Sequence, residues 1–180
     1  MKQFTAFSAS IEAKGAGLLA IIEGMGIFKS KAIQVLSENG ISDLTAEQWY
    51  PQQSWLNALR TIAETVGVNT LYSIGMKVPD LAVFPSGIDS IEKALSSLDD
   101  AYRLNHRGGK IGYFRYEKTG EKSALMICDN PYPCAFDRGI ITAVAKKFKP
   151  ADSLMVQVTH DDSALCRVKG GDYCTYIIAW

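Results

Sequence analysis

Residues 127–141, ICDNPYPCAFDRGII, decide the fold class of this chain. The apolar run up to Cys128 has the composition of a β-strand, two prolines then interrupt it, and apolar residues return at helical spacing after Cys134. The closing segment, residues 165–180, contains the other two cysteines, Cys166 and Cys174. These two stretches therefore predict a strand, a turn and a helix that meet a pair of C-terminal strands.

The apolar spacing upstream of this stretch changes near Lys110, from about four residues to two. Glycine-containing turns at residues 118–121 and 169–172 favour two hairpins. The elements expected in this half are strands at residues 112–117, 123–128, 154–159, 165–168 and 173–178, with one helix at 135–148.

The first half of the chain is predicted to be helical. Thr45 to Gln48 fits a capping box that opens a helix, and Pro79 is expected to end one. The expected helices are 4–14, 18–27, 30–39, 45–66, 69–76 and one that begins at Ser90. The fold class is therefore α+β, with N-terminal helices packed on an antiparallel sheet and the order β-β-α-β-β-β in the C-terminal half.

The length of 180 residues predicts one domain over residues 1–180, with a mainly helical part (1–109) and a sheet-containing part (110–180). Nineteen basic and nineteen acidic residues give no net charge, which argues against a nucleic-acid binder. No apolar run is long enough for a membrane span. A cytoplasmic location follows as the default, and there cysteines are more often thiols or metal ligands than disulfides.

The cysteines suggest a metal site. Cys166 and Cys174 flank a glycine turn, and an odd loop length would place them face to face on one side of the hairpin. Cys134 begins a helix, where the dipole favours the thiolate. Buried cysteines that act only as small apolar side chains are the alternative. The candidates for a fourth ligand are Cys128, His160, Asp161 and Asp162.

The C-terminal pattern Phe136-x-x-Gly139 followed by Cys166-x3-Gly-Gly-x2-Cys174-x-Tyr-x-Ile resembles the 4-vinyl reductase domain. That family belongs to a ligand-binding superfamily with haem NO-binding domains, Golgi transport-particle subunits and the input domains of bacterial phenol- and xylene-sensing regulators. The resemblance covers residues 127–180 firmly and the upstream helices loosely.

The resemblance implies a structural zinc ion held by Cys134, Cys166 and Cys174. In the aromatic-sensing relatives an acidic residue three positions before the first hairpin cysteine is the fourth ligand, but that position here is Ser163. Cys128 or Asp162 would have to replace it. Zinc is therefore the expected cofactor.

Aromatic residues could line an apolar pocket between helices and sheet for a small apolar or aromatic ligand. His106 follows a predicted helix, where it is expected to cap carbonyl groups. Haem is not expected, because the Tyr-x-Ser-x-Arg signature of the NO-sensing branch is absent. The candidate ligand-binding residues are Trp55, Tyr72, His106 and Tyr113.

No phosphate-binding loop or catalytic triad is present in the sequence, so no catalytic residue is expected. We therefore expect a small-molecule sensor or carrier that signals as a homodimer or through a separate partner. The alternatives are an enzyme or accessory protein of tetrapyrrole metabolism, a haem-binding gas sensor, and a structural assembly subunit.

Overall fold

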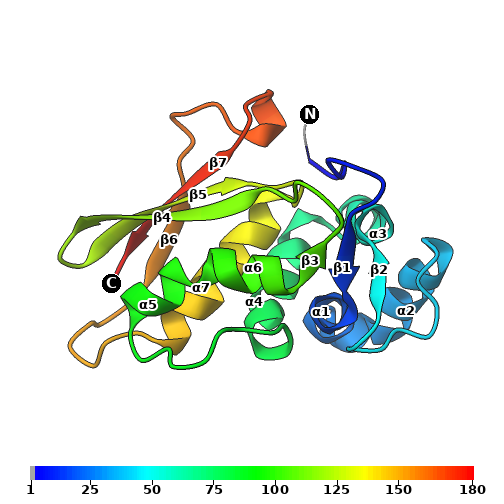
Figure 1. Cartoon of the computed structure of the whole chain (residues 1–180), viewed down its shortest axis with the longest axis horizontal. Coiled ribbons are helices and arrows are strands. Elements are labelled where there is room, and N and C mark those ends of the chain that lie inside the picture. Colours follow the sequence, from blue (N-terminus) through cyan, green and yellow to red (C-terminus); the bar gives the residue numbers. More distant parts are fainter. Residues whose placement is uncertain (1–2) are drawn as a thin grey trace.

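The computed structural model describes residues 3–180 and shows a four-stranded antiparallel sheet with helices packed beneath one face (Figure 1). The strand order is β4-β5-β7-β6, so the C-terminal strand lies inside the sheet. The bounds are β4 Tyr113–Gly120, β5 Ser123–Asp129, β6 Gln157–His160 and β7 Cys174–Ala179. These strands and helices confirm the predicted α+β fold class, in which helices pack on an antiparallel sheet.

Helices make up most of the chain before β4, together with a second, three-stranded sheet of order β2-β1-β3. The α-helices are α1 Gly15–Gly24, α2 Lys29–Glu38, α3 Gln52–Thr65, α4 Val68–Leu81, α5 Ile91–Ser96, α6 Leu98–Leu104 and α7 Cys134–Lys147. The remaining elements are β1 Glu12–Lys14, β2 Trp49–Pro51, β3 His106–Arg107 and two 3₁₀ turns, η1 Gly26–Phe28 and η2 Arg167–Lys169.

The small sheet replaces two helical segments that the sequence predicted. Residues 4–14 are not a helix, because β1 pairs with β2 and β3, and Ala13 lies opposite both Tyr50 and His106. The capping box at Thr45 is also absent, since the amide of Thr45 donates to the hydroxyl of Tyr50 instead. Long-range strand pairing thus overrides local helical spacing here.

The strand expected at residues 165–168 is also wrong. The carbonyl of Cys166 accepts hydrogen bonds from the amides of Lys169 and Gly171, which closes a tight turn there. A Cβ atom at Gly171 would lie 2.7 Å from the carbonyl oxygen of Leu165, so the turn needs glycine at that position. β7 therefore pairs with β5 and β6, and Cys174 lies opposite Cys128.

Helices α4 and α7 cross with their backbones in contact. A Cβ atom at Gly139 would lie 2.3 Å from the carbonyl oxygen of Tyr72, and one at Gly75 would lie 2.1 Å from that of Phe136. Pro79 does not end α4 as predicted, and the helix continues to Leu81. The proline removes one helical hydrogen bond, and the amide of Ala82 still donates to the carbonyl oxygen of Val78 at the end of the helix.

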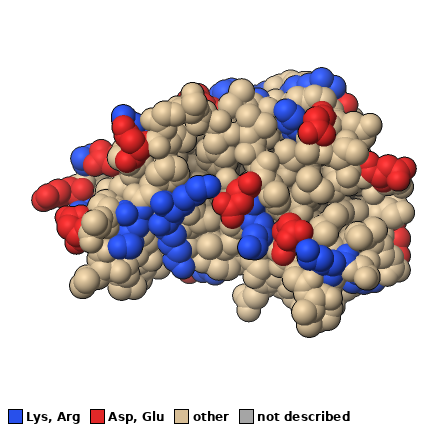
Figure 2. Space-filling model, turned by 90° about the horizontal axis from the view of Figure 1, so that it is seen from below, with Lys and Arg blue, Asp and Glu red and all other residues tan. Residues whose placement is uncertain are grey.

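The surface carries acidic and basic side chains near one another on the face that Figure 2 shows, in keeping with the zero net charge. Across residues 3–180, no helix has the length and apolar character needed to cross a membrane.

Candidate functional site

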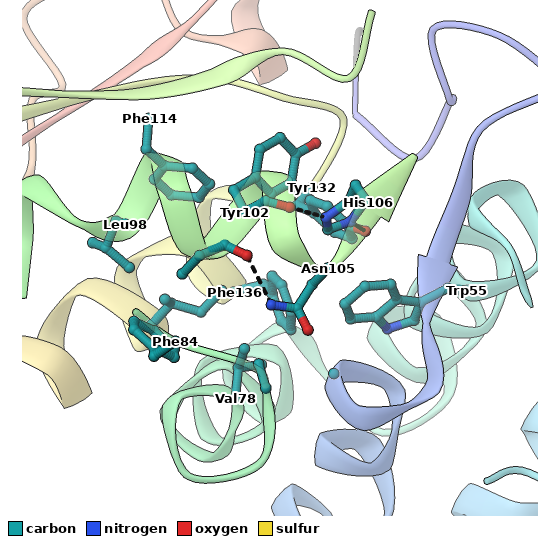
Figure 3. A pocket seen from close by; sticks show the side chains of 14 residues that line it. Trp55, Val78, Phe84, Leu98, Tyr102, Asn105, His106, Phe114, Tyr132 and Phe136 are labelled. Atoms are coloured by element: carbon teal, nitrogen blue, oxygen red, sulfur yellow. Dashed lines mark hydrogen bonds between the residues drawn. The ribbon is translucent and has the colours of Figure 1, made fainter. Parts of the chain in front are cut away.

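A small apolar cavity of about 50 Å³ lies between α4, α6 and the start of α7 (Figure 3). The side chain of His106, which follows α6, reaches it and is 7% exposed. The residues that line the cavity are Gly17, Trp55, Val78, Ala82, Phe84, Leu98, Ala101, Tyr102, Asn105, His106, Phe114, Tyr132, Phe136 and Ile140.

The tautomer of His106 follows from its partners. Nδ1 lies 2.9 Å from the carbonyl oxygen of Tyr102, which can only accept, so Nδ1 carries the proton. Burial lowers the pKa of His106 to about 4, so the ring is neutral near pH 7. Nε2 therefore has a lone pair, which accepts a hydrogen bond from the Tyr132 hydroxyl at 2.6 Å.

Tyr132 fills the space in front of His106. Its ring packs against Trp55 and Phe136, with centroids 4.8 and 5.2 Å away. Its hydroxyl also accepts a hydrogen bond of 3.2 Å from Nε2 of Gln52. Gln52, Tyr132 and His106 thus form a buried chain of hydrogen bonds at the cavity.

Asn105 lines the cavity next to His106 (Figure 3). Its amide group donates to the carbonyl oxygens of Ala101 and Val83 and accepts from the amide of Val83. These bonds join the end of α6 to the segment after α4, so they fix the wall beside His106.

The predicted ligand-binding residues divide into two groups. Trp55 and His106 line the cavity, whereas Tyr72 and Tyr113 do not. The ring of Tyr72 instead lies 5.1 Å from the guanidinium of Arg138. Tyr132 was not among the predicted residues, although its position between Pro131 and Pro133 signals a fixed turn.

A second group of side chains lies where α7, β6, η2 and β7 meet. The possible ligand atoms of Cys134, His160, Cys166 and Cys174 all lie within 4.8 Å of one another. The sulfur atoms of Cys134 and Cys174 are 3.2 Å apart, and every cysteine is a free thiol. The structure thus brings the three predicted cysteines together with His160.

His160 has the arrangement of a metal-binding histidine. Nδ1 lies 2.9 Å from a carboxylate oxygen of Asp162, while the buried Nε2 has no hydrogen-bond partner. Histidines that bind metals commonly donate their other ring N–H to a carboxylate. Asp162 therefore contacts His160 rather than the cysteines, and Cys128 also lies outside the group.

The pKa values of Cys134 and Cys174 shift in opposite directions. The hydrogen bond between the two sulfur atoms, together with the positive charge of Arg167, lowers the pKa of Cys174 against the opposing effect of burial. The same pairing with Cys174, followed by burial, raises the pKa of Cys134. Cys174 is therefore the more acidic cysteine of the pair.

Arg167 supports this group from a fully buried position. Its guanidinium donates to Asp137 at 2.6 Å, to Asn130, and to the sulfur of Cys174 at 3.3 Å. Burial raises the pKa of Asp137, and the adjacent guanidinium opposes that rise. The network ties the segment before β7 to the start of α7.

No protein-family profile matches the chain, and no curated protein sequence matches it. The chain does match solved protein structures. An H-NOX protein from S. oneidensis in the Fe(II) ligation state is 14% identical, with a TM-score of 0.65 over 92% of this chain and 95% of that one. The unliganded Fe(II) H-NOX protein from K. algicida is 12% identical, with a TM-score of 0.61 over 92% and 95%.

A third neighbour comes from work on haem redox potential and porphyrin distortion, and is 13% identical with a TM-score of 0.63 over 93% of this chain and 99% of that one. At these identities the likeness establishes a shared fold. The broader resemblance to haem NO-binding domains is thus supported at the level of fold, while the narrower one to 4-vinyl reductase domains is not.

The expected cofactor needs correction. Zinc was preferred and haem was not expected, but the neighbours are described in Fe(II) states and with haem. The sequence misled here because the prediction relied on a missing Tyr-x-Ser-x-Arg signature, whereas the fold is shared without it.

Proposed function

We propose that this protein is a haem-binding gas-sensor domain in which His106 is the iron ligand. The proposal rests on one observation above all: His106 is a neutral, buried imidazole that lines an apolar pocket, and its Nε2 accepts a hydrogen bond from the Tyr132 hydroxyl. The H-NOX fold supports it, because the neighbours with that fold are described with Fe(II) and haem.

The donor chemistry at His106 fits haem iron. A neutral imidazole is a common ligand of haem iron, and the bond from Nδ1 to the Tyr102 carbonyl fixes the ring. Aromatic rings from Trp55, Phe114 and Phe136 would exclude water around a flat ligand. The lining includes no lysine or arginine, so the axial bond and ring contacts would carry the affinity.

Haem can bind only if the cavity beside His106 becomes larger. Pockets for ligands of this class are roughly 300 Å³ or larger, and the cavity here is about 50 Å³. Tyr132 occupies the position in front of Nε2, so its hydroxyl has to leave His106 when haem binds. Bound haem would supply an iron centre for a diatomic gas.

The chain offers a matched test because it has only two histidines. Purified protein is titrated with haem, and the Soret absorption is followed for wild type, His106→Ala and His160→Ala. We expect saturation at one equivalent for wild type and His160→Ala and loss of that saturation for His106→Ala. Equal binding by His106→Ala, or no saturable binding by wild type, would contradict the proposal.

We also propose that Cys134, Cys166, Cys174 and His160 hold a soft divalent metal ion. Three sulfur donors and one imidazole form a donor set that suits such ions. The specific support is the buried Nε2 of His160, which has no partner and belongs to this group. A buried polar atom without a partner calls for an explanation, and a bound ion provides one.

Cobalt is a suitable probe, because Co²⁺ bound by thiolates absorbs strongly by charge transfer. The absorption is expected in wild type and Cys128→Ser, and it should be lost in Cys166→Ser and His160→Ala. Loss in Cys128→Ser with retention in His160→Ala would make Cys128 the fourth ligand and overturn this set.

Signalling through a homodimer or a separate partner, and a cytoplasmic location, remain predictions from the sequence. A small apolar or aromatic ligand is the alternative occupant of the pocket. Sedimentation of the haem-loaded chain would reveal a dimer directly.

A further inference from the structure

Residues 3–6, at the N-terminal end of the described chain, reach the cysteine group. Nε2 of Gln3 donates a hydrogen bond to the sulfur of Cys134, 2.8 Å away. Gln3 is only 6% exposed, although it stands near the chain terminus. Cys134 is half-buried, whereas Cys166 and Cys174 are buried. Gln3 therefore contacts the least buried cysteine of the group.

Backbone and side-chain contacts hold these N-terminal residues in place. The amide of Phe4 donates to the carbonyl oxygen of Pro131, in the turn before α7. The carbonyl oxygen of Phe4 accepts from Nε2 of Gln53 at 3.0 Å and from the guanidinium of Arg60 at 2.9 Å, both on α3. The amide of Ala6 donates to Oε1 of Gln53. Residues 3–6 are thus fixed between α3 and the turn that leads to α7.

The backbone bends sharply at Phe4. Its φ angle of 62° lies in the left-handed region, which residues with a side chain disfavour. Such a conformation persists only where the surrounding contacts hold it. Because Gln3 directly precedes this bend, the contacts of Phe4 also fix the place of Gln3 beside Cys134.

A metal ion in the cysteine group would leave negative charge on the sulfur atoms. Three thiolates and one neutral imidazole around a divalent ion carry a net negative charge. Burial makes such a charge costly unless hydrogen-bond donors face it. The guanidinium of Arg167 donates to the sulfur of Cys174 at 3.3 Å, and Gln3 donates to that of Cys134. Two of the sulfur atoms therefore already have an N–H donor.

We propose that Gln3 is a positioning residue of the metal site, and that its N–H group stabilises the metal-bound sulfur of Cys134. The proposal rests on the metal ion proposed for this group. A sulfur atom that binds a metal retains lone pairs, so it can accept the hydrogen bond from Gln3 while it holds the ion. The donor offsets part of the charge on the sulfur and keeps Cys134 directed at the ion.

The test compares Gln3→Leu with Gln34→Leu. Leucine keeps much of the size of glutamine but has no hydrogen-bond donor on its side chain. Gln34 is the matched control, because it lies on α2 and its amide bonds to Glu38 of the same helix. One readout is the affinity for Co²⁺, measured against a competing chelator. The other is the wavelength of the charge-transfer absorption from sulfur to cobalt.

Gln3→Leu should bind Co²⁺ about 10-fold more weakly or worse, the usual effect of losing a side chain that supports a metal ligand. Its charge-transfer band should move to longer wavelength, because a sulfur without the hydrogen bond gives up electron density to the metal more readily. Gln34→Leu should change neither readout.

Unchanged Co²⁺ affinity in Gln3→Leu would show that the role of Gln3 is wrong while the metal site stands. Weaker binding with an unmoved band would also contradict the proposal, since Gln3 would then only cover the site. If wild type shows no charge-transfer absorption with Co²⁺, both the metal site and the role of Gln3 fail.

Discussion

The two histidines of this protein, His106 and His160, have similar hydrogen-bonding environments. In each, an acceptor lies at Nδ1, the Tyr102 carbonyl for His106 and the Asp162 carboxylate for His160. In each, Nε2 faces a site. The two acceptors differ in charge, since one is a neutral carbonyl and the other a carboxylate. The carboxylate makes the ring of His160 a stronger electron-pair donor to a cation.

Asp162→Asn should weaken Co²⁺ binding at the cysteine group by roughly 10- to 100-fold, the usual effect of losing such a carboxylate. The matched control is Asp161→Asn, since that carboxylate bonds to Ser163 and not to His160. Equal losses in both variants would show that general charge, and not the orientation of His160, controls affinity.

His106 should make the haem-free protein sensitive to acid. Its pKa is about 4 in the folded protein and about 6.5 in the unfolded chain, so between these values the unfolded chain binds the extra proton. The stability that neutral His106 contributes is present above pH 6.5 and is lost as the pH falls to 4, by about 3 kcal/mol.

Urea unfolding at several pH values measures this effect as the difference between wild type and His106→Gln. Asp137 is present in both proteins, so its own titration cancels. Parallel stability curves from pH 4 to 7 would mean that His106 is not buried as a neutral ring.

Sequence patterns located some of these residues and missed others. The cysteines were found because their spacing around a glycine turn places them near one another, although the turn is 3₁₀ and not a hairpin. Tyr132 was missed because spacing does not say which way a loop tyrosine points. Asp162 was expected as a ligand because the sequence could not show that His160 lies between it and the sulfurs.

The crossing of α4 and α7 positions both candidate sites. α7 begins with Cys134 in the cysteine group and places Phe136 in the pocket, and it can approach α4 only because Gly75 and Gly139 lack side chains. This explains the glycine of the Phe136-x-x-Gly139 pattern in terms of packing.

Gly139→Ala should destabilise the protein by roughly 1–3 kcal/mol, because the new methyl group would lie 2.3 Å from a backbone oxygen. Gly17→Ala in α1 is the control, since its methyl group would meet only Trp55 at 3.4 Å. Urea unfolding should show little loss for Gly17→Ala. Equal stability of the two variants would contradict the close crossing.

Local patterns predicted the elements whose partners are adjacent in the chain. β4, β5 and α7 follow their apolar periodicity closely. The segments at 4–14 and 45–51 were mistaken for helices because their partners are distant: β1 pairs with residues around 50 and around 106. Such pairing leaves little trace in local spacing.

At the scale of the whole molecule, the two sites share one segment, residues 130–137. Tyr132 points from it into the histidine pocket, and Cys134 points into the cysteine group. The buried Arg167 network holds this segment against the C-terminal sheet. A metal ion at the cysteines would therefore secure the wall of the pocket.

The most direct measurement is the resonance Raman spectrum of the Fe(II) haem-loaded protein in the region of the iron–histidine stretch. We predict this band in wild type and His160→Ala, its absence in His106→Gly, and its return when imidazole is added to His106→Gly. A band that persists in His106→Gly without imidazole would show that another residue binds the iron. That result would contradict the proposal that His106 is the iron ligand.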